Sequence, residues 1–309
     1  MKPNGKVAVL LLMACAVVGC SKRGESPKAK ADATTPAATS GEPAAFKHVD
    51  GEGFAENAAA KVTTPASFGD GEAAYQAKNY SDATKIFEEY TARRPENAWG
   101  HYMLGLSAWK SGDLAKSENA FEVALRIDPK HVKSYINLSR VLIEQKRFDD
   151  AIAKLTVATE VDAESIEVPR LMARAYTAQN KIDEAVDAYR RAIVLNERDA
   201  WSLNNLGLLF LDQGFTEDAV PYLAKAIEVN PNVPAFHNNL GMALEHMGRF
   251  LGATEAYKGA LAADPRYEKA RQNLARVAAV KGGPEEPFDL AALARGVDEE
   301  RKVARDETK

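Results

Sequence analysis

The histidines are the side chains of this sequence best suited to metal binding or catalysis, and their spacing fits neither role. The 309 residues include five of them: His48, His101, His131, His237 and His246. None belongs to an HExxH or Cys-His pattern, and His237 and His246 are too far apart in sequence to chelate from one helix face. No GxSxG motif, Walker loop or strand-linked GxGxxG occurs. We therefore expect no metal, no cofactor and no enzymatic activity.

A stretch of positive charge stands out in a chain whose net charge is −4. It consists of Lys133, Arg140, Arg170 and Arg174. Because arginine can hold a carboxylate through two hydrogen bonds, one hypothesis is that this stretch binds an acidic segment of another protein or a free C-terminus. The alternative is that the arginines pair with acids on their own helices, Arg140 with Glu144 and Arg170 with Glu167.

Large aromatic side chains are a second candidate binding feature. Tryptophan, tyrosine and arginine carry much of the binding energy at protein interfaces. The candidates here are Trp99, Tyr102, Trp109 and Trp201. The alternative is that Trp99 and Trp201 merely cover the ends of helices.

Asparagines form a third candidate feature, because four of them are separated by multiples of 34 residues. They are Asn137, Asn205, Asn239 and Asn273. Each amide offers donors and an acceptor, so such a row can hydrogen-bond the backbone of a bound peptide without reading its sequence. The same asparagine also supports helix packing in ordinary repeats, and the sequence does not decide between the two roles.

The period of 34 residues organises most of the chain. It separates Pro95 from Pro129 and Pro231 from Pro265. Small residues share another phase: Ala83, Ser117, Ala151, Ala185, Ala219 and Ala253. The register is unbroken from about residue 66 to about residue 265. A period of this size is typical of stacked units of secondary structure.

Each unit has the pattern of two amphipathic helices joined by a turn, as in residues 235–246 and 251–262. Leu-Gly pairs recur in the first helix, at Leu104-Gly105, Leu206-Gly207 and Leu240-Gly241, and turn glycines recur at Gly112, Gly214 and Gly248. This combination resembles the tetratricopeptide repeat (TPR). The resemblance implies an all-α fold, a right-handed superhelical solenoid of about six helix pairs plus a C-terminal capping helix, over residues 67–281. The third and fourth repeats depart from the family pattern, with Ala163 and Glu197 in place of proline.

In arrays that resemble this one, the first helix of each pair lines a concave groove that binds segments of other proteins. Projecting the repeat register onto the sequence gives the expected groove residues: Trp99, Tyr102, Trp109, Lys133, Asn137, Arg140, Arg170, Arg174, Trp201, Asn204, Asn205, Asn238, Asn239 and Met242. Their types change along the array, from aromatic to basic to amide-rich. We expect partner selectivity to come from this change.

The N-terminus has the pattern of a secretory signal. Two lysines precede an apolar run, residues 7–18, which is too short to span a membrane comfortably. The run ends in Val-Val-Gly-Cys, which resembles the lipobox of bacterial lipoproteins. The resemblance implies removal of residues 1–19 and a lipid on Cys20. Ser21, which stands where the inner-membrane retention signal has Asp, favours an outer-membrane anchor facing the periplasm. The alternative is an ordinary signal peptide with an incidental cysteine.

Two flanking segments have compositions typical of disorder. Residues 20–66 are rich in Ala, Pro, Thr and Ser, and we expect a flexible tether. Residues 282–309 are charged, and we expect them to be disordered as well, although a short amphipathic helix over residues 288–297 is an alternative.

The expected function is therefore a lipid-anchored scaffold or adaptor of the bacterial envelope. Its partners would be peptide segments of other envelope proteins, and its lipid on Cys20 would bind the membrane. The net charge of −4 argues against nucleic acid as a partner. We expect no small-molecule substrate. A more specific alternative is a pilotin-like factor that assembles an outer-membrane secretin for type IV pili or secretion. A catalytic protein that uses the repeats as a platform would need a second domain, for which the tail is too short.

Overall fold

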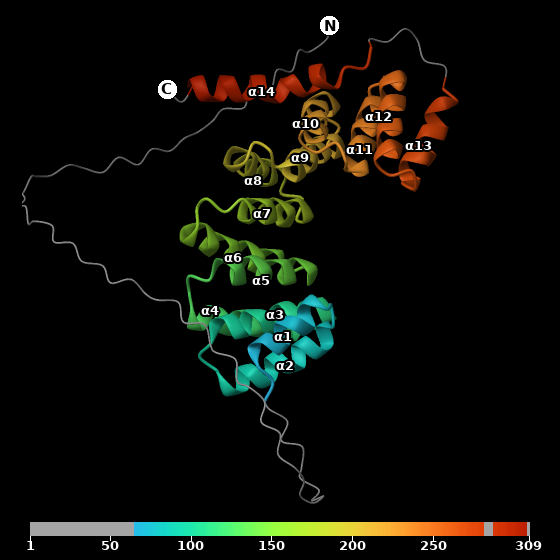
Figure 1. Cartoon of the computed structure of the whole chain (residues 1–309). Helices are drawn as coiled ribbons and strands as arrows, with labels where there is room; N and C mark the ends of the chain where they lie inside the picture. Colours follow the sequence, from blue (N-terminus) through green and yellow to red (C-terminus); the bar gives the residue numbers. More distant parts are fainter. Residues whose placement is uncertain (1–64, 281–286, 308–309) are drawn as a thin grey trace, which may run out of the picture. The chain divides into compact units, whose positions relative to one another are not determined.

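The computed structural model describes residues 65–280 and 287–307, with residues 299–307 described by their backbone alone. These residues form fourteen α-helices and no strand (Figure 1). The helices are α1 (Phe68–Gln76), α2 (Tyr80–Arg93), α3 (Ala98–Ser111), α4 (Leu114–Ile127), α5 (Val132–Glu144), α6 (Phe148–Val161), α7 (Glu167–Ala178), α8 (Ile182–Leu195), α9 (Ala200–Asp212), α10 (Thr216–Val229), α11 (Pro234–His246), α12 (Phe250–Ala263), α13 (Glu268–Ala278) and α14 (Leu290–Glu307). The predicted signal peptide (1–19), Cys20 and nearly all of the predicted tether (20–66) lie outside the described residues.

The first twelve helices form six consecutive pairs, and α13 begins a seventh unit. Each of these helices packs against the helix before it and the helix after it. The result is an all-α superhelical solenoid, which confirms the fold predicted from the 34-residue period. The array begins at Ser67, whose hydroxyl accepts from the backbone N–H of Asp70 while the Asp70 carboxylate accepts from the N–H of Ser67. This reciprocal capping box fixes the start of α1.

Six turns within the helix pairs contain a residue with left-handed backbone. Three are the expected glycines, with φ of 90° at Gly112, 82° at Gly214 and 72° at Gly248. The other three turns have Lys78, Lys146 and Asn180 at the same phase of the repeat, with φ of 62°, 62° and 58°. A side chain in this conformation costs about 1–2 kcal/mol, so packing of the flanking helices must hold these three turns.

The second helix of five pairs ends at an aspartate or asparagine. These residues are Asp128, Asp162, Asn196, Asn230 and Asp264, with φ between −126° and −145°. In each case a side-chain oxygen accepts a hydrogen bond from the backbone N–H two residues later. The helices before Ala163 and Glu197 therefore end in the same way as those before proline, because the preceding Asx residue forms the turn.

Glycine in the first helix makes room for a large side chain of the second helix. A Cβ added at Gly105 would lie 2.6 Å from the ring of Phe121, and one at Gly241 would lie 2.5 Å from the ring of Tyr257. Both rings are fully buried. The Leu-Gly phase of the repeat thus sets how closely the two helices of a pair approach.

The buried apolar side chains of the described chain form two clusters that divide within α7. One cluster extends from Ala83 to Leu171 and the other from Ala173 to Val297. Helix α7 therefore contributes to both. This helix also starts without a side-chain cap, since its N-cap residue, Ile166, has none to offer.

The expectation of disorder over residues 282–309 is wrong for the residues that the structure describes. Helix α14 runs along α10, where Ala294 and Val297 are buried and Lys225 pairs with Asp298 at 3.0 Å (Figure 1). The close approach is possible because Gly296 lies against Pro221, to whose ring carbons an added Cβ would be only 3.0 Å distant. The charged composition hid a narrow apolar stripe, which a long helix can bury even when most of its residues are polar.

Truncating Val297 is expected to destabilise the array. Val297 is 2% exposed and belongs to the second cluster, so Val297→Ala should lower the free energy of unfolding by about 1–2 kcal/mol. Urea unfolding followed by circular dichroism measures this loss. The matched control is Val194→Ala, because Val194 is 74% exposed and should tolerate the same truncation. Equal stability of the two variants would show that α14 does not contribute to the core.

Candidate functional site

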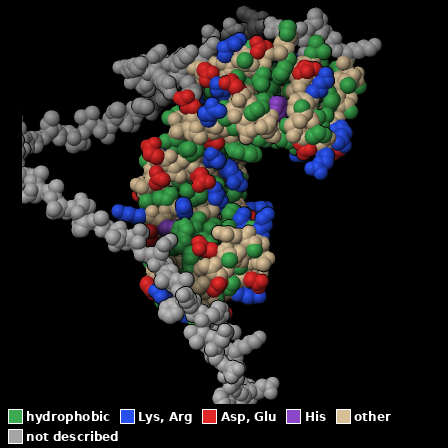
Figure 2. All heavy atoms as spheres, in the orientation of Figure 1, with side chains coloured by type: hydrophobic (Ala, Val, Ile, Leu, Met, Phe, Trp, Pro, Cys, Tyr) green, Lys and Arg blue, Asp and Glu red, His purple; other side chains and the backbone are tan. Residues whose placement is uncertain are grey.

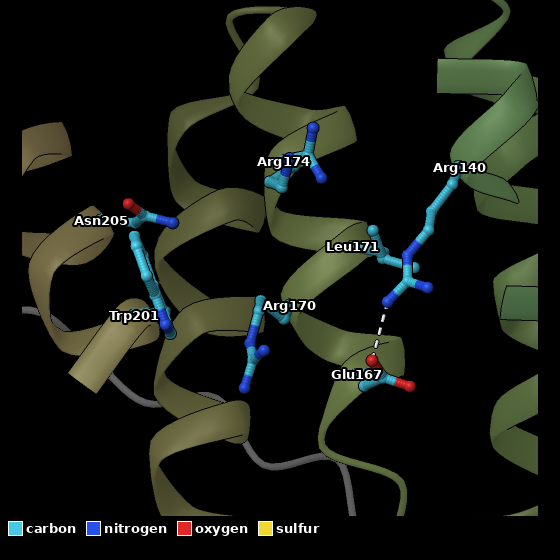
Figure 3. A pocket seen from close by; sticks show the side chains of 7 residues that line it. All are labelled: Arg140, Glu167, Arg170, Leu171, Arg174, Trp201 and Asn205. Atoms are coloured by element: carbon cyan, nitrogen blue, oxygen red, sulfur yellow. Dashed lines mark hydrogen bonds and ion pairs between the residues drawn. The ribbon is translucent and has the colours of Figure 1, made fainter. Parts of the chain in front are cut away.

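The first helices of three successive repeats enclose a pocket of about 380 Å³. Arg140 comes from α5, while α7 and α9 supply the other side chains that line it: Glu167, Arg170, Leu171, Arg174, Trp201 and Asn205. Figure 3 shows Arg140 extending from α5 towards α7, with Trp201 and Asn205 on the opposite side. Five of the eight groove residues predicted in the third, fourth and fifth repeats are thus brought together, and Lys133, Asn137 and Asn204 are not among them. In Figure 2, Lys and Arg side chains gather at the level of α5 and α7.

The arginines of the pocket pair with acids of neighbouring repeats. Arg140 Nη2 lies 2.7 Å from Glu167 Oε1 on α7, and Arg140 does not pair with Glu144 on its own helix. Arg170 Nη2 lies 2.8 Å from Asp199 Oδ1 at the start of α9, and not beside Glu167. Both same-helix pairings are therefore wrong. Adjacent first helices lie close enough for the long arginine side chains to reach across.

Asp199 holds Arg170 in a buried network. The side chain of Asp199 is 3% exposed, and Oδ2 accepts hydrogen bonds from Arg170 Nε at 3.1 Å and from Ser202 Oγ at 2.5 Å. A carboxylate with this many donors is fixed in place. Arg170 therefore ties α7 to α9 and has a structural role in addition to lining the pocket.

Arg174 differs from the other two arginines. Its side chain is exposed, and no carboxylate of the described residues forms an ion pair with it. The pocket contains three arginines and, with Asp199 behind it, two carboxylates, which leaves one positive charge. That charge favours an anionic ligand.

Trp201 gives the pocket an apolar wall. Its side chain is 51% exposed, and its ring meets the fully buried ring of Phe236 edge-on at 5.1 Å. Leu171, which is 3% exposed, forms the floor from α7. Trp201 is therefore supported from behind by Phe236 and open in front, which leaves part of its ring accessible to a ligand.

Two members of the asparagine row, Asn239 and Asn273, bond to asparagines that lie outside the row. Asn239 Nδ2 donates to Asn204 Oδ1 at 2.8 Å, and Asn273 Nδ2 donates to Asn238 Oδ1 at 3.0 Å. Asn204 and Asn238 are buried, with 4% and 3% exposure. The interpretation of these two residues as groove-lining is therefore wrong. Their amides connect neighbouring first helices, which is the packing role that the sequence left open.

Asn137 is buried in the same way. Its Nδ2 donates to Tyr102 Oη at 3.3 Å and to the backbone oxygen of Lys133 at 2.9 Å. Its Oδ1 accepts from Arg140 Nη1 at 2.9 Å, which orients that guanidinium. Asn137 therefore positions a pocket residue and is not itself available to a ligand.

The aromatic residues of the second repeat form a separate cluster. Trp99 lies 4.9 Å from Tyr102 and 5.6 Å from the ring of His131, and Lys133 Nζ lies 5.6 Å from the Trp99 centroid. Tyr102 is only 7% exposed, so its expected place in the groove is wrong, and burial raises the pKa of its hydroxyl. Trp99 remains 40% exposed.

Two further predicted groove residues have contacts of their own. Trp109 Nε1 donates to Glu144 Oε2 at 2.8 Å, which links α3 to α5. Met242 is partly buried, and its sulfur lies 3.4 Å from Asn238 Nδ2. Neither residue lines the pocket of the middle repeats.

Within the described residues, no group of three His, Cys, Asp or Glu side chains is placed to hold a metal ion. Cys20, the predicted lipidation site, lies outside those residues. None of the helices in residues 65–280 and 287–307 is long and apolar enough to cross a membrane.

Acid is expected to weaken the end of the array through Glu245. Hydrogen bonds from Arg276 and then from Tyr257 hold the pKa of this carboxyl below its ordinary 4.5. A carboxyl with a lowered folded pKa stabilises the fold above the unfolded pKa, and this contribution is lost as the pH falls through the folded value. Unfolding free energies measured at several pH values below 4.5 should therefore fall less in Glu245→Gln than in the wild type. Glu255→Gln, which removes an acid from an exposed pair with Lys258, is the control for the loss of one carboxylate.

Comparison with known proteins places this solenoid in a family. A tetratricopeptide repeat model matches residues 102–164 and 204–268, and a second TPR repeat model matches residues 173–214. Stacked helix pairs of this kind form the extended concave surfaces that repeat proteins use for binding. The chain belongs to the tetratricopeptide-repeat family, whose members mediate protein–protein interaction and bind peptide segments of other proteins.

Two relatives are similar to part of the array. The chain is 31% identical over 111 residues to the Hsp70-Hsp90 organising protein of Plasmodium falciparum. The matched segment covers 33% of this chain and 20% of that protein. It is 28% identical over 97 residues to stress-induced-phosphoprotein 1 of Caenorhabditis elegans, which covers 29% of this chain and 30% of that protein. The chain thus spans less than a third of either relative.

Solved structures share the fold. That of pilF from Pseudomonas aeruginosa is similar with a TM-score of 0.56 and 15% identity, over 67% of this chain and 94% of that chain. The APC/C hetero-tetramer Cut9-Hcn1 is similar with a TM-score of 0.55 and 16% identity, over 67% of this chain and 41% of that chain. At these identities the likeness concerns the fold alone.

Proposed function

We propose that this protein is a membrane-anchored adaptor that binds peptide segments of other envelope proteins in the groove of its repeats. The observation that carries the proposal is the pocket between α5, α7 and α9, where Arg174 and Trp201 are both exposed. An arginine that has no acidic partner among the described residues lies beside an exposed, supported tryptophan, and both residue types are enriched at binding hot spots. The family supports binding of a protein segment over binding of a small molecule.

The anchor and the compartment rest on the N-terminal sequence. A lipid on Cys20, followed by Ser21, would hold the protein at the outer membrane facing the periplasm. Several acyl chains bind a membrane firmly, because each buried methylene contributes about 0.8 kcal/mol. Replacement of Cys20 by serine in the full-length chain tests this part. The wild type should sediment with membranes and Cys20→Ser should not, and equal sedimentation of the two would refute the lipid anchor.

Partner capture from envelope extract tests the binding role. Crosslinked partners should be recovered with the wild type and lost with a variant that carries Trp201→Ala and Arg174→Gln. The control is Val194→Ala, since Val194 is an exposed apolar side chain on α8 that does not line the pocket. Equal recovery by all three proteins would refute the pocket as the binding surface.

A pilotin-like assembly factor for an outer-membrane secretin is the more specific alternative. It is supported by the lipobox-like Val-Val-Gly-Cys together with six repeats in one chain. Capture distinguishes it from a general adaptor. A secretin subunit among the partners, and loss of assembled secretin in a deletion strain, would favour the pilotin. Partners from cell-wall or proteolytic pathways, with secretin assembly intact, would favour the adaptor.

A further inference from the structure

The two acids beside the pocket hold their arginines in different ways. Asp199 is 3% exposed, receives hydrogen bonds from two side chains and belongs to the packing between α7 and α9. Glu167 is 49% exposed and forms one bond, from Arg140 Nη2 at 2.7 Å. An exposed single pair of this kind contributes little to stability, so Glu167 can leave Arg140 at little cost.

Arg140 does not depend on Glu167 for its position. Its Nη1 donates to Oδ1 of the buried Asn137 at 2.9 Å, and its side chain is 29% exposed. We therefore expect the bond to Asn137 to keep the guanidinium directed towards α7 when Glu167 is displaced. Figure 3 shows the Glu167 carboxylate at the edge of the pocket, on the first turn of α7, in contact with the tip of Arg140.

We propose that Glu167 is a built-in competitor that occupies the place of a ligand carboxylate. An incoming carboxylate displaces Glu167 and pairs with Arg140. Arg174 lines the same pocket and supplies a positive charge that no carboxylate of the described residues balances. This inference rests on the proposed function, because it assumes that the pocket binds a segment of another protein. It assigns to Glu167 a regulatory role that opposes binding, in contrast to the structural role of Asp199.

The pocket also specifies the neighbours of that carboxylate. Trp201 and Leu171 present apolar surface beside the arginines, and Asn205 lines the same wall. The ligand class is therefore a carboxylate flanked by large apolar side chains. A side chain of Glu or Asp and a chain terminus both supply this chemistry, and probes can separate the two sources.

Titration of small probes into the isotope-labelled full-length protein, followed by the Trp201 indole N–H signal, tests the inference. The probes are acetyl-Leu-Glu-Leu-amide, the matched acetyl-Leu-Gln-Leu-amide, and acetyl-Leu-Gln-Leu with a free C-terminus. Glu167→Gln should bind the carboxylate probes at least threefold more tightly than the wild type. It should not bind the neutral probe more tightly. If only acetyl-Leu-Glu-Leu-amide bound more tightly, the pocket would be assigned to acidic side chains. If only the probe with a free C-terminus bound more tightly, the pocket would be assigned to chain termini.

A matched variant controls for the change in net charge. Glu122→Gln also removes an acid from an exposed ion pair between neighbouring repeats, with Lys154 at 3.6 Å, but Glu122, which is 45% exposed, does not line the pocket. It should leave probe affinity within a factor of 1.5. Unchanged or weaker binding by Glu167→Gln, with the wild type binding normally, would overturn the competitor role and leave the proposed function standing. If neither protein bound either carboxylate probe, the pocket itself would be refuted as a carboxylate site.

Discussion

Replacing Arg140 and Arg174 together by glutamate is expected to weaken partner binding by at least about 30-fold. The pocket now has three arginines against Glu167 and Asp199, a sum of +1, and the two replacements change it to −3. Loss of a binding hot spot costs about 2 kcal/mol or more, which is a factor of about 30 in the dissociation constant. An acidic segment would also meet repulsion in place of attraction. Calorimetric titration with a captured partner measures the change.

Two exposed lysines outside the pocket provide the control for this variant. Lys85 and Lys258 are 70% and 57% exposed, and each forms an ion pair only with an acid three residues away on its own helix among the described residues. Replacing both by glutamate changes the net charge of the protein by the same amount. We expect partner affinity to change less than threefold. Similar weakening by both double variants would mean that overall charge, and not the pocket, governs binding.

Replacing Arg170 by alanine is expected to cost about 3 kcal/mol of folding stability. This change leaves Asp199 at 3% exposure with only Ser202 as a side-chain donor in the described residues. Removing one partner of a buried ion pair costs about 3–5 kcal/mol because the other charge remains buried, and the partial exposure of Arg170 reduces this figure. Urea unfolding measures the loss. Arg174→Ala should change stability by less than about 0.5 kcal/mol, because Arg174 is exposed.

A double variant separates loss of the pair from loss of the arginine itself. In Arg170→Ala with Asp199→Ala no buried charge is left behind, so we expect at least half of the lost stability to return. A double variant that is less stable than Arg170→Ala would show that Asp199 stabilises α9 independently of Arg170. In that case the network would not be the reason for the cost.

The repeat scaffold was predictable because its causes are local and recur. The Leu-Gly pairs and turn glycines identify which residues form each helix pair, and the structure confirms the stack. Lys146 and Asn180 show the limit of this reasoning, since they adopt the conformation of Gly112 and Gly214 without being glycine. Their place in the 34-residue register was the signal that could have found them.

The pocket was predictable in outline and not in its pairings. The repeat register predicts that Arg140, Arg170, Arg174 and Trp201 lie on first helices, and the structure places them there, around one pocket. The register did not show that Arg140 reaches Glu167 or that Arg170 reaches Asp199, because these partners are 27 and 29 residues apart and lie on opposite sides of an intervening helix in sequence. Side-chain contacts across repeats depend on how far neighbouring helices are displaced, which periodicity alone does not determine.

The asparagines and the C-terminal helix were misjudged for related reasons. A side-chain amide can hydrogen-bond a peptide ligand or a neighbouring amide equally well. The residue type at positions 204 and 238 therefore does not reveal which of the two partners each asparagine binds. Residues 282–309 taken together look too charged to fold alone, but the part from 290 to 298 is mostly apolar. This part is ordered because α10 offers an apolar surface that fits Ala294 and Val297.

The central claim is that partners contact the groove at Trp201, and site-specific photocrosslinking in cells measures that contact directly. Benzoylphenylalanine placed at position 201 probes the pocket, and the same group at position 194, which is 74% exposed on α8, probes the outside. We expect a discrete crosslinked partner from position 201 that disappears when Arg140 and Arg174 are replaced by glutamate, and none from position 194. Crosslinks from position 194 alone, or crosslinks from position 201 that persist after the charge reversal, would contradict the account.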